Sequence, residues 1–288
     1  MGLKLEEVSY VYEPGTPMET RALEPVSLSV EPGEVLAIIG ATGSGKSTLI
    51  QMMNGLNRPS SGRVLFHGQD IFEEKYDRRQ LRSRVGLVFQ YPEYRLFETN
   101  VLKDICFGPR NQGLSEEVCL ERARRAMAVV GLSQAYENRS PFELSGGEKR
   151  RAAIAGVLAM EPEILILDEP TAGLDPQGRE ELMSELMALK QQAGLGIVLV
   201  SHSMEEVAKL ADRIIILSRG RLLFSGLARE VFSRGELLQE AGLDLPAAGR
   251  ILSRLKETGL PLETDALTID EALNRIMALF SAPGQKQE

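Results

Sequence analysis

Apolar residues occur along the chain in short unbroken runs, separated by stretches with helical periodicity. The runs are four or five residues long and rich in branched side chains, and they lie at residues 35–39, 85–89, 164–167, 197–200 and 214–217. Unbroken runs of this length are typical of strands buried on both faces, as in a parallel sheet covered by helices. Between them, residues 116–130 and 180–192 place apolar side chains on one helical face. Strands that alternate with helices predict an α/β fold.

The first part of the chain has a different pattern. Residues 3–12, 26–30 and 63–66 have strand-like composition between Pro and Gly clusters, which predicts a small antiparallel sheet beside the main one. Further along, residues 92–160 show mostly helical patterns and interrupt the series of strands. We therefore expect a helical subdomain in that region.

The strand pattern stops after Gly226. Short amphipathic patterns separated by loops follow over residues 236–280. We predict one main domain over residues 1–235 and a short helical C-terminal extension over 236–288, whose tail SAPGQKQE is expected to be disordered.

Composition indicates a soluble globular protein. The apolar fraction is 43%, and a formal charge of −8 argues against a nucleic-acid partner, because phosphate binding normally needs a basic face. No apolar run approaches the ~20 residues of a membrane-spanning helix, and no signal peptide is evident, so membrane contact is expected only through partners. Cys106 and Cys119 form no CxxC pair, which predicts two reduced, partly buried thiols in a cytoplasmic protein.

A phosphate-binding motif directly follows the first apolar run. The sequence GATGSGKST fits GxxxxGK[ST] and lies between a predicted strand and a predicted helix. Its residues are Gly40, Ala41, Thr42, Gly43, Ser44, Gly45, Lys46, Ser47 and Thr48. In such a loop, backbone N–H groups wrap the phosphates of ATP, the lysine lies between the β- and γ-phosphates, and the hydroxyl of Ser47 ligates Mg²⁺. The alternative is a Gly-rich turn with a chance lysine.

Two acidic residues follow a later apolar run. Asp168 and Glu169 come directly after residues 164–167, so they are expected at the carboxyl end of a buried strand, where α/β sheets bind ligands. There Asp168 would hold Mg²⁺ through water, and Glu169 would orient or deprotonate the attacking water. Considered alone, the pair is also compatible with a helix N-cap beside a surface acid.

A second candidate anion site lies in the sequence FELSGGEKRR. Ser145, Gly146 and Gly147 precede a helical stretch, and a serine with exposed N–H groups at a helix start can bind an anion. One chain has no evident use for two such sites, unless the second serves ATP held by a partner subunit. An ordinary Ser/Gly helix cap is the alternative. The stretch resembles the LSGGQ signature of ABC ATPases, with Glu148 where that family usually has glutamine.

This resemblance implies roles for four further residues. Gln90 matches the Q-loop glutamine that touches Mg²⁺ and senses the transporter, and Asp175 matches the D-loop that crosses the dimer interface. His202 matches the switch histidine that contacts the γ-phosphate, and Tyr12 matches the aromatic that stacks on adenine. The family also implies a P-loop NTPase (RecA-like) core, an ABC helical subdomain, and ATP hydrolysis in a head-to-tail dimer. Without the family, His202 and Tyr12 would be structural residues.

Several longer stretches resemble the ATPases of energy-coupling factor (ECF) transporters, among them VFQYPEYRLFETNVLKDICFGPRN and VSHSMEEVAKLADRI. The stretch VSYVYEPGTPMETRAL looks like the second A-type subunit of a heteromeric pair. The resemblance implies an importer of vitamins or transition-metal ions on the cytoplasmic side of the membrane. Its partners would be a second ATPase subunit (a paralogue or the same chain), a transmembrane T-component and a substrate-binding S-component.

Two other classes are open alternatives. A non-transport ABC ATPase acting on DNA or ribosomes usually carries a long coiled coil, and only 55 positions separate Gln90 from Ser145. A regulatory subunit with an inactive site would be expected to lack Lys46, Glu169 or His202, and all three are present. An ATPase subunit of another type of ABC transporter also fits the motifs.

Overall fold

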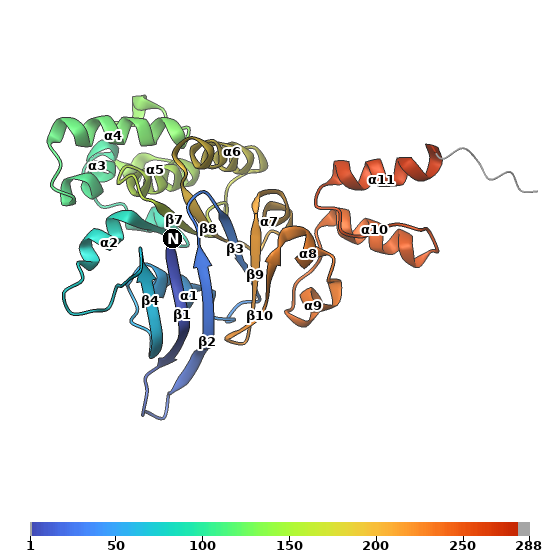
Figure 1. Cartoon of the computed structure of the whole chain (residues 1–288). Helices are drawn as coiled ribbons and strands as arrows, with labels where there is room; N and C mark the ends of the chain where they lie inside the picture. The colour runs from blue at the N-terminus through green and yellow to red at the C-terminus, as the bar shows by residue number, and fades with distance from the viewer. Residues whose placement is uncertain (1, 282–288) are drawn as a thin grey trace, which may run out of the picture.

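Two sheets of different type form the centre of the molecule (Figure 1). The computed structural model describes residues 2–281. The predicted disordered tail falls almost entirely on residues 282–288, which lie outside the described residues.

The main sheet has the strand order β10-β9-β3-β8-β7-β6. Its strands are β3 (Val35–Ile39), β6 (Val85–Val88), β7 (Ile164–Asp168), β8 (Gly196–Val200), β9 (Arg213–Ser218) and β10 (Arg221–Leu227). Five of these strands pair in parallel and correspond to the five apolar runs, which confirms the predicted α/β class. Strand β10 was not predicted, because this antiparallel edge strand consists of half-buried and exposed residues that form no apolar run.

The antiparallel sheet has the order β2-β1-β4-β5, as predicted for the N-terminal part of the chain. Its strands are β1 (Leu3–Tyr12), β2 (Thr20–Val30), β4 (Ser61–Phe66) and β5 (Gln69–Asp70). The prediction placed the start of β2 six residues too late. Residues 20–24 are mostly polar or exposed, but they pair with the end of β1 across a hairpin and are therefore extended.

Helices cover the main sheet and continue to Ser281, the last described residue. They are α1 (Lys46–Met53), α2 (Arg78–Arg84), α3 (Val101–Asn111), α4 (Glu116–Val129), α5 (Gly146–Leu158), α6 (Pro176–Ala193), α7 (Met204–Leu210), α8 (Ala228–Phe232), α9 (Gly235–Glu240), α10 (Ala247–Glu257) and α11 (Ile269–Ser281). Helix α6 starts four residues before the predicted position. The Asp175 carboxylate accepts a hydrogen bond from the N–H of Gly178, and Pro176 occupies the first turn of the helix. This cap lets the helix begin at Pro176, before the first residue of the apolar pattern.

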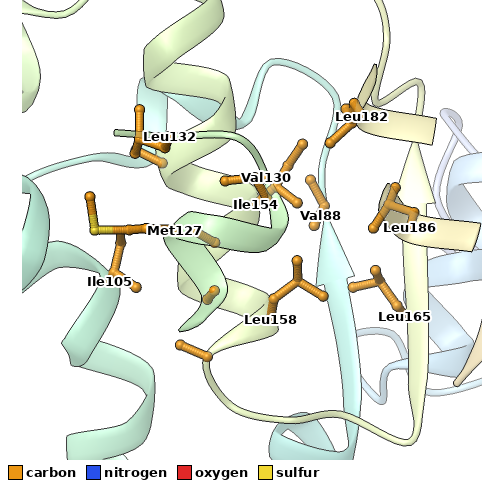
Figure 2. Close-up of a cluster of buried hydrophobic side chains, with 14 of the residues drawn as sticks. Val88, Ile105, Met127, Val130, Leu132, Ile154, Leu158, Leu165, Leu182 and Leu186 are labelled. Carbon is orange, nitrogen blue, oxygen red and sulfur yellow. The ribbon is translucent and has the colours of Figure 1, made fainter. Parts of the chain in front are cut away.

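Hydrophobic side chains fill both faces of the main sheet. On one face α3–α6 pack against β6, β7 and β8, and Figure 2 shows Ile154 and Leu158 of α5 together with Val88 and Leu165. The opposite face packs on α1 and the antiparallel sheet. This arrangement fixes the carboxyl ends of β3, β6, β7 and β8 side by side, and the candidate site residues follow those ends.

Helices α10 and α11 have a small core of their own, made by Ala248, Leu252, Leu262, Ala266 and Ala272. They lie to one side of the two sheets in Figure 1. A hydrogen bond from the N–H of Ala247 to the Glu205 carboxylate, 3.1 Å long, joins α10 to α7. The domain boundary at residue 235 stays a prediction: the separate core begins at Ala248, whereas Leu238 and Ala241 pack with Ala37, Ile39 and other buried residues of the main sheet.

The two cysteines correct one expectation. They were expected to be partly buried, but Cys106 and Cys119 are both fully buried between α3 and α4. The thiol of Cys106 donates to the carbonyl oxygen of Cys119 at 3.4 Å, and burial raises the pKa of Cys106 to about 11. The apolar faces of two helices enclose both side chains, which spacing along the chain does not reveal.

Candidate nucleotide-binding site

The phosphate cradle connects β3 to α1, and its backbone requires glycine. Gly45 has a φ of 103°, and a Cβ at this residue would lie 2.8 Å from the carbonyl oxygen of Ala22. A Cβ on Gly40 would lie 2.2 Å from the carbonyl oxygen of Leu217. Neither position has room for a side chain, so the loop can lie close to an anion and direct its N–H groups toward it.

Lys46 and Ser44 supply buried polar groups to the cradle. The Nζ of Lys46 donates to the carbonyl oxygens of Gly40 and Ala41 at 2.7 and 3.0 Å. Burial lowers the pKa of Lys46, and two nearby carboxylates oppose that shift. The hydroxyl of Ser44 is buried and has no hydrogen-bond partner among the described residues. Buried polar atoms normally have partners, so the cradle suits a ligand rich in acceptor oxygens, such as a phosphate chain.

Asp168 lies at the end of β7, beside the start of α1. Burial raises the pKa of Asp168 to about 6 and the charge of Glu169 adds to this shift, while Lys46 and a hydrogen bond with Ser47 oppose it. The carboxylate and the hydroxyl are both oxygen ligands of the kind that Mg²⁺ prefers. Among the described residues, no three acidic, histidine or cysteine side chains form a ready-made metal site. A metal ion here would therefore need ligands from the nucleotide as well.

The carboxylate of Glu169 lies between the two residues predicted to act with it. The Nε2 of Gln90 donates to its Oε2 at 3.0 Å, and the Nε2 of His202 lies 2.7 Å from its Oε1. Glu169 has a φ of 52°, in the left-handed region that non-glycine residues rarely adopt, and its N–H donates to the carbonyl of Val200. Strained backbone of this kind is common at functional sites, where surrounding contacts hold it in place.

These side chains line one cavity of about 440 Å³. The predicted residues in its lining are Tyr12, Thr42, Gly43, Gly45, Lys46, Ser47, Thr48, Gln90, Asp168, Glu169 and His202. The hydroxyl of Tyr12 lies 3.0 Å from the Oγ1 of Thr48, and 41% of the Tyr12 residue is exposed. An exposed aromatic ring beside a phosphate cradle has the surface that a stacked base needs.

The cavity also includes residues that the sequence analysis missed. Thr20, Arg21 and Ala22 line it, and in the register of the two strands Thr20 lies opposite Tyr12 and Arg21 opposite Val11. The hairpin between β1 and β2 returns these residues to the end of β1 that carries Tyr12. The one feature of the sequence that marks these residues is that TRAL directly follows the stretch EPGTPME. We used that stretch only for the resemblance to a family and assigned no role to the residues after it.

A further missed residue, Glu206, joins two loops of the site. The carboxylate of Glu206 accepts hydrogen bonds from the hydroxyls of Thr171 and Ser201 at 2.8 and 3.0 Å. It therefore ties the loop after Glu169 to the loop that carries His202. The signal was available in the stretch VSHSMEE, where a second acid follows the histidine.

The predicted second anion site lies apart from this cavity. The Oγ of Ser145 accepts a hydrogen bond from the N–H of Glu148 at 3.4 Å, while the Glu148 carboxylate accepts one from the N–H of Ser145 at 2.8 Å. This is a capping box at the start of α5. The cavity of the described chain is not lined by any residue of this second site, which comprises Ser145, Gly146, Gly147 and Asp175. Their functional roles remain predictions.

The comparison with known proteins agrees with the geometry. The ABC transporter family matches residues 23–172. The energy-coupling factor transporter ATP-binding protein EcfA2 of Caldanaerobacter subterraneus is 50% identical over 96% of this chain and 97% of that protein. The protein of the same name from Clostridium tetani is 48% identical over 98% of each chain.

Solved structures give the same result. The structure of cbiO1 from Clostridium perfringens, part of the ABC transporter complex cbiONQ, superposes with a TM-score of 0.73 at 39% identity and covers 87% of this chain and 98% of that one. The ATP-binding cassette MJ0796, a dimer bound to ADP and phosphate, has a TM-score of 0.70 at 29% identity over 78% and 98% of the two chains. None of the described helices is long and apolar enough to cross a membrane. The chain belongs to the ABC transporter family and is an ATP-binding and ATP-hydrolysing subunit of the ECF transporter type.

Proposed function

We propose that this chain is one of two ATPase subunits of an importer of vitamins or transition-metal ions, and that the two subunits close head to tail around ATP. The observation that carries the proposal is the separation of two phosphate-binding helix starts. The start of α1 lines the cavity, whereas Ser145 at the start of α5 does not. A partner's nucleotide would give the second helix start its ligand. The dimeric form of the related MJ0796 cassette supports such an arrangement.

The residues of the cavity divide into phosphate, metal and base contacts. Lys46 and the N–H groups of the cradle hold the phosphates of ATP. Ser47, Gln90 and Asp168 would hold Mg²⁺, which neutralises the charge that develops on the phosphates. Tyr12 stacks on the adenine. The hydrogen-bonded Ser47 and Asp168, side by side at the cradle, support this assignment.

Glu169 orients or deprotonates the attacking water, and His202 contacts the γ-phosphate. Their contact at 2.7 Å, with Gln90 on the other carboxylate oxygen, supports a catalytic unit that responds to the γ-phosphate. When the phosphate competes for His202 and Gln90, the carboxylate is released toward water. This places a general base where hydrolysis needs it.

Residues 91–98, which follow Gln90, form the proposed docking surface for the transmembrane T-component. Tyr91, Tyr94 and Phe97 are 49%, 84% and 58% exposed, an unusual concentration of solvent-facing aromatic rings. Leu96 is buried, and the guanidinium of Arg95 lies 3.8 Å from the ring centre of Phe89, so these two side chains are occupied by contacts within the chain. Tyr94 and Phe97 are therefore the residues to test.

The extension over residues 236–288 is proposed to help hold the two ATPase subunits together. Ile269, Leu273 and Phe280 of α11 are 64%, 53% and 77% exposed and leave an apolar face for a partner. Attachment through the T-component, which works with an S-component, places the chain on the cytoplasmic side of the membrane.

The head-to-tail arrangement is tested by trans complementation in the complex purified with a tag on this chain. Lys46→Ala here and a signature-serine change in the other subunit should damage the same composite site. Their combination should then cost little more than either change alone. Losses that multiply would mean that each helix start serves its own chain, and would contradict the proposal.

Docking is tested by copurification from membrane extracts and by uptake. Tyr94→Ala with Phe97→Ala should reduce the recovery of the integral-membrane partner, while ATP affinity of the isolated chain stays unchanged. Met18→Ala is the control, because Met18 is 75% exposed in the hairpin between β1 and β2. Full recovery of the partner with the double variant would place the docking surface elsewhere.

A further inference from the structure

A buried arginine lies where three of the predicted motifs meet. Arg150 belongs to α5, five residues after Ser145, and only 3% of its side chain is exposed. A buried guanidinium is unfavourable unless its N–H groups are paired, so its surroundings indicate what it holds together. The proposed function above gives this residue no role.

One side of Arg150 holds the segment after Gln90. Its Nε and Nη2 donate to the two carboxylate oxygens of Glu93 at 3.2 and 3.3 Å, and Glu93 is itself largely buried. The centre of the guanidinium lies 6.0 Å from the ring centre of Tyr91. Two parallel hydrogen bonds from a planar group fix direction as well as distance. Arg150 therefore fastens the short helix η1 (Pro92–Arg95) to the helix that begins at Ser145.

The other side of Arg150 faces the loop between β7 and α6. The Nη1 is buried and has no hydrogen-bond partner among the described residues. A Cβ on Gly173 would lie 4.0 Å from this nitrogen, and one on Gly147 would lie 3.5 Å from the side chain of Leu174. Helix α5 thus touches the loop that leads to Asp175 at two places. The unpaired Nη1 therefore lies close to the backbone of this loop at Gly173, and each peptide of the loop carries a carbonyl oxygen that can accept a hydrogen bond.

We propose that Arg150 is a positioning residue for ATP hydrolysis, which links the segment after Gln90, helix α5 and the loop 171–175 into one moving body. In the arrangement that hydrolyses ATP, Nη1 donates to a carbonyl oxygen of that loop. Arg150 touches no nucleotide and acts through Gln90, Ser145 and Asp175. The inference rests on the proposed function in one respect, the action of Ser145 on ATP bound by a partner.

The competing explanation is that Arg150 and Glu93 only fill space. A buried ion pair can often be replaced by apolar residues of similar volume without loss of stability, whereas removal of one partner is destabilising. The test variant is therefore Glu93→Leu with Arg150→Met. Its control is Glu121→Leu with Arg125→Met on the outer surface of α4, where both side chains are more than half exposed. This change removes the ion pair between them of 2.6 Å and also the contact of Arg125 with Glu161 at 3.0 Å.

Kinetics of the purified transporter complex separate the two explanations. We expect the Glu93/Arg150 variant to keep its melting temperature and its KM for ATP, and to lose about tenfold in kcat, the pattern of a contact made only in the transition state. The control pair should keep both constants. If the Glu93/Arg150 variant is as stable and as active as the native complex, the pair only fills space and the proposal is wrong.

Arg150→Lys gives an independent result, also in the event that the double variant does not fold. A lysine keeps the charge beside Glu93, but it cannot make the bidentate contact with that carboxylate and at the same time supply a donor in place of Nη1. We expect it to fold and to lose kcat by about threefold without a change in KM. Native kcat in this variant would also overturn the proposal.

The mechanical link can be measured in the isolated chain, apart from any partner. Labels on Tyr94→Cys and Phe142→Cys report the distance between the segment after Gln90 and the short helix η3 (Pro141–Glu143), which leads into α5. The two residues are 84% and 68% exposed and so accessible to label. The native thiols are buried and do not compete for label. The distance distribution should stay narrow with and without ATP, and should broaden in Arg150→Lys. An unchanged distribution would refute the link, whereas failure of the trans complementation alone would refute only the dimer.

Discussion

Two helix starts of this chain are predicted to bind anions, and their surroundings differ. At the start of α1, Lys46 and two carboxylates gather around one cavity. At the start of α5, Ser145 and Glu148 satisfy each other in a capping box, and no lysine reaches them among the described contacts. The first is a nucleotide site in a single chain. The second has the backbone of an anion site but no cavity lined by a lysine and two carboxylates, which is consistent with the proposal that it forms half of a composite site.

The largest effect expected from this contrast is on the chemical step at the first helix start. Glu169→Gln should slow ATP hydrolysis by a factor of about 10²–10⁴, because the amide cannot accept the proton of the attacking water. ATP binding should persist, and the ATP-loaded dimer should accumulate. Steady-state turnover and gel filtration with ATP measure both. Near-native turnover in the complex would assign the activation of water to another group.

The next largest effect shows which of the two helix starts binds ATP in the isolated chain. Lys46→Ala should weaken ATP binding to the isolated chain by about a hundredfold, since a charge-assisted contact contributes about 1.5–3 kcal/mol. Ser145→Ala should leave that affinity unchanged, because Ser145 does not line the cavity. Equilibrium dialysis with labelled ATP is sufficient for both variants. A comparable loss in both would show that the two helix starts bind one nucleotide within one chain.

Some features of the fold and the site could be predicted from the sequence, and others could not. The buried strands, the cradle and the acids after β7 were predicted because unbroken apolar runs fix both the sheet and its ligand-binding edge. Arg21 was missed, since only strand pairing across a hairpin brings it opposite Val11 and into the cavity that Tyr12 also lines. Arg150 was missed because its contact with Glu93 spans 57 positions. Local patterns carry no information about which distant polar side chains will meet in the folded chain.

A smaller effect concerns the metal side of the first site. The pKa of Asp168 is raised to about 6, so its carboxylate takes up a proton in the folded chain at a higher pH than in the unfolded chain. Because the fold disfavours the ionised form of Asp168, the free energy of unfolding falls as the pH rises from the ordinary pKa of an aspartate to about 6. Above pH 6 this loss of stability stays constant. Below pH 6 a proton competes with Mg²⁺ for the same oxygens.

Affinity for MgATP should therefore fall by up to about tenfold per pH unit below 6 and should level off above pH 7. Asp168→Asn should remove this pH dependence. ATP itself also titrates in this range, and the pH profile measured with Asp168→Asn gives that contribution, which can then be subtracted. Titrations of MgATP at pH 5, 6 and 7.5 provide the measurement. Identical pH profiles in the native chain and in Asp168→Asn would exclude Asp168 from metal binding.

The smallest effect decides whether the second helix start is more than a cap. Ser145 and Ser115 cap α5 and α4 in the same way, each with an Oγ that accepts an N–H bond of 3.4 Å three residues later. Alanine at either position should cost about 1 kcal/mol of unfolding free energy, the usual contribution of an N-cap serine. Urea unfolding of the isolated chain measures that cost. In the assembled complex Ser115→Ala should then hydrolyse ATP at the native rate, and Ser145→Ala should not, because only Ser145 would meet a partner's phosphate. Equal stability losses with equal native activity would reduce Ser145 to a helix cap, and the head-to-tail dimer would lose its structural basis.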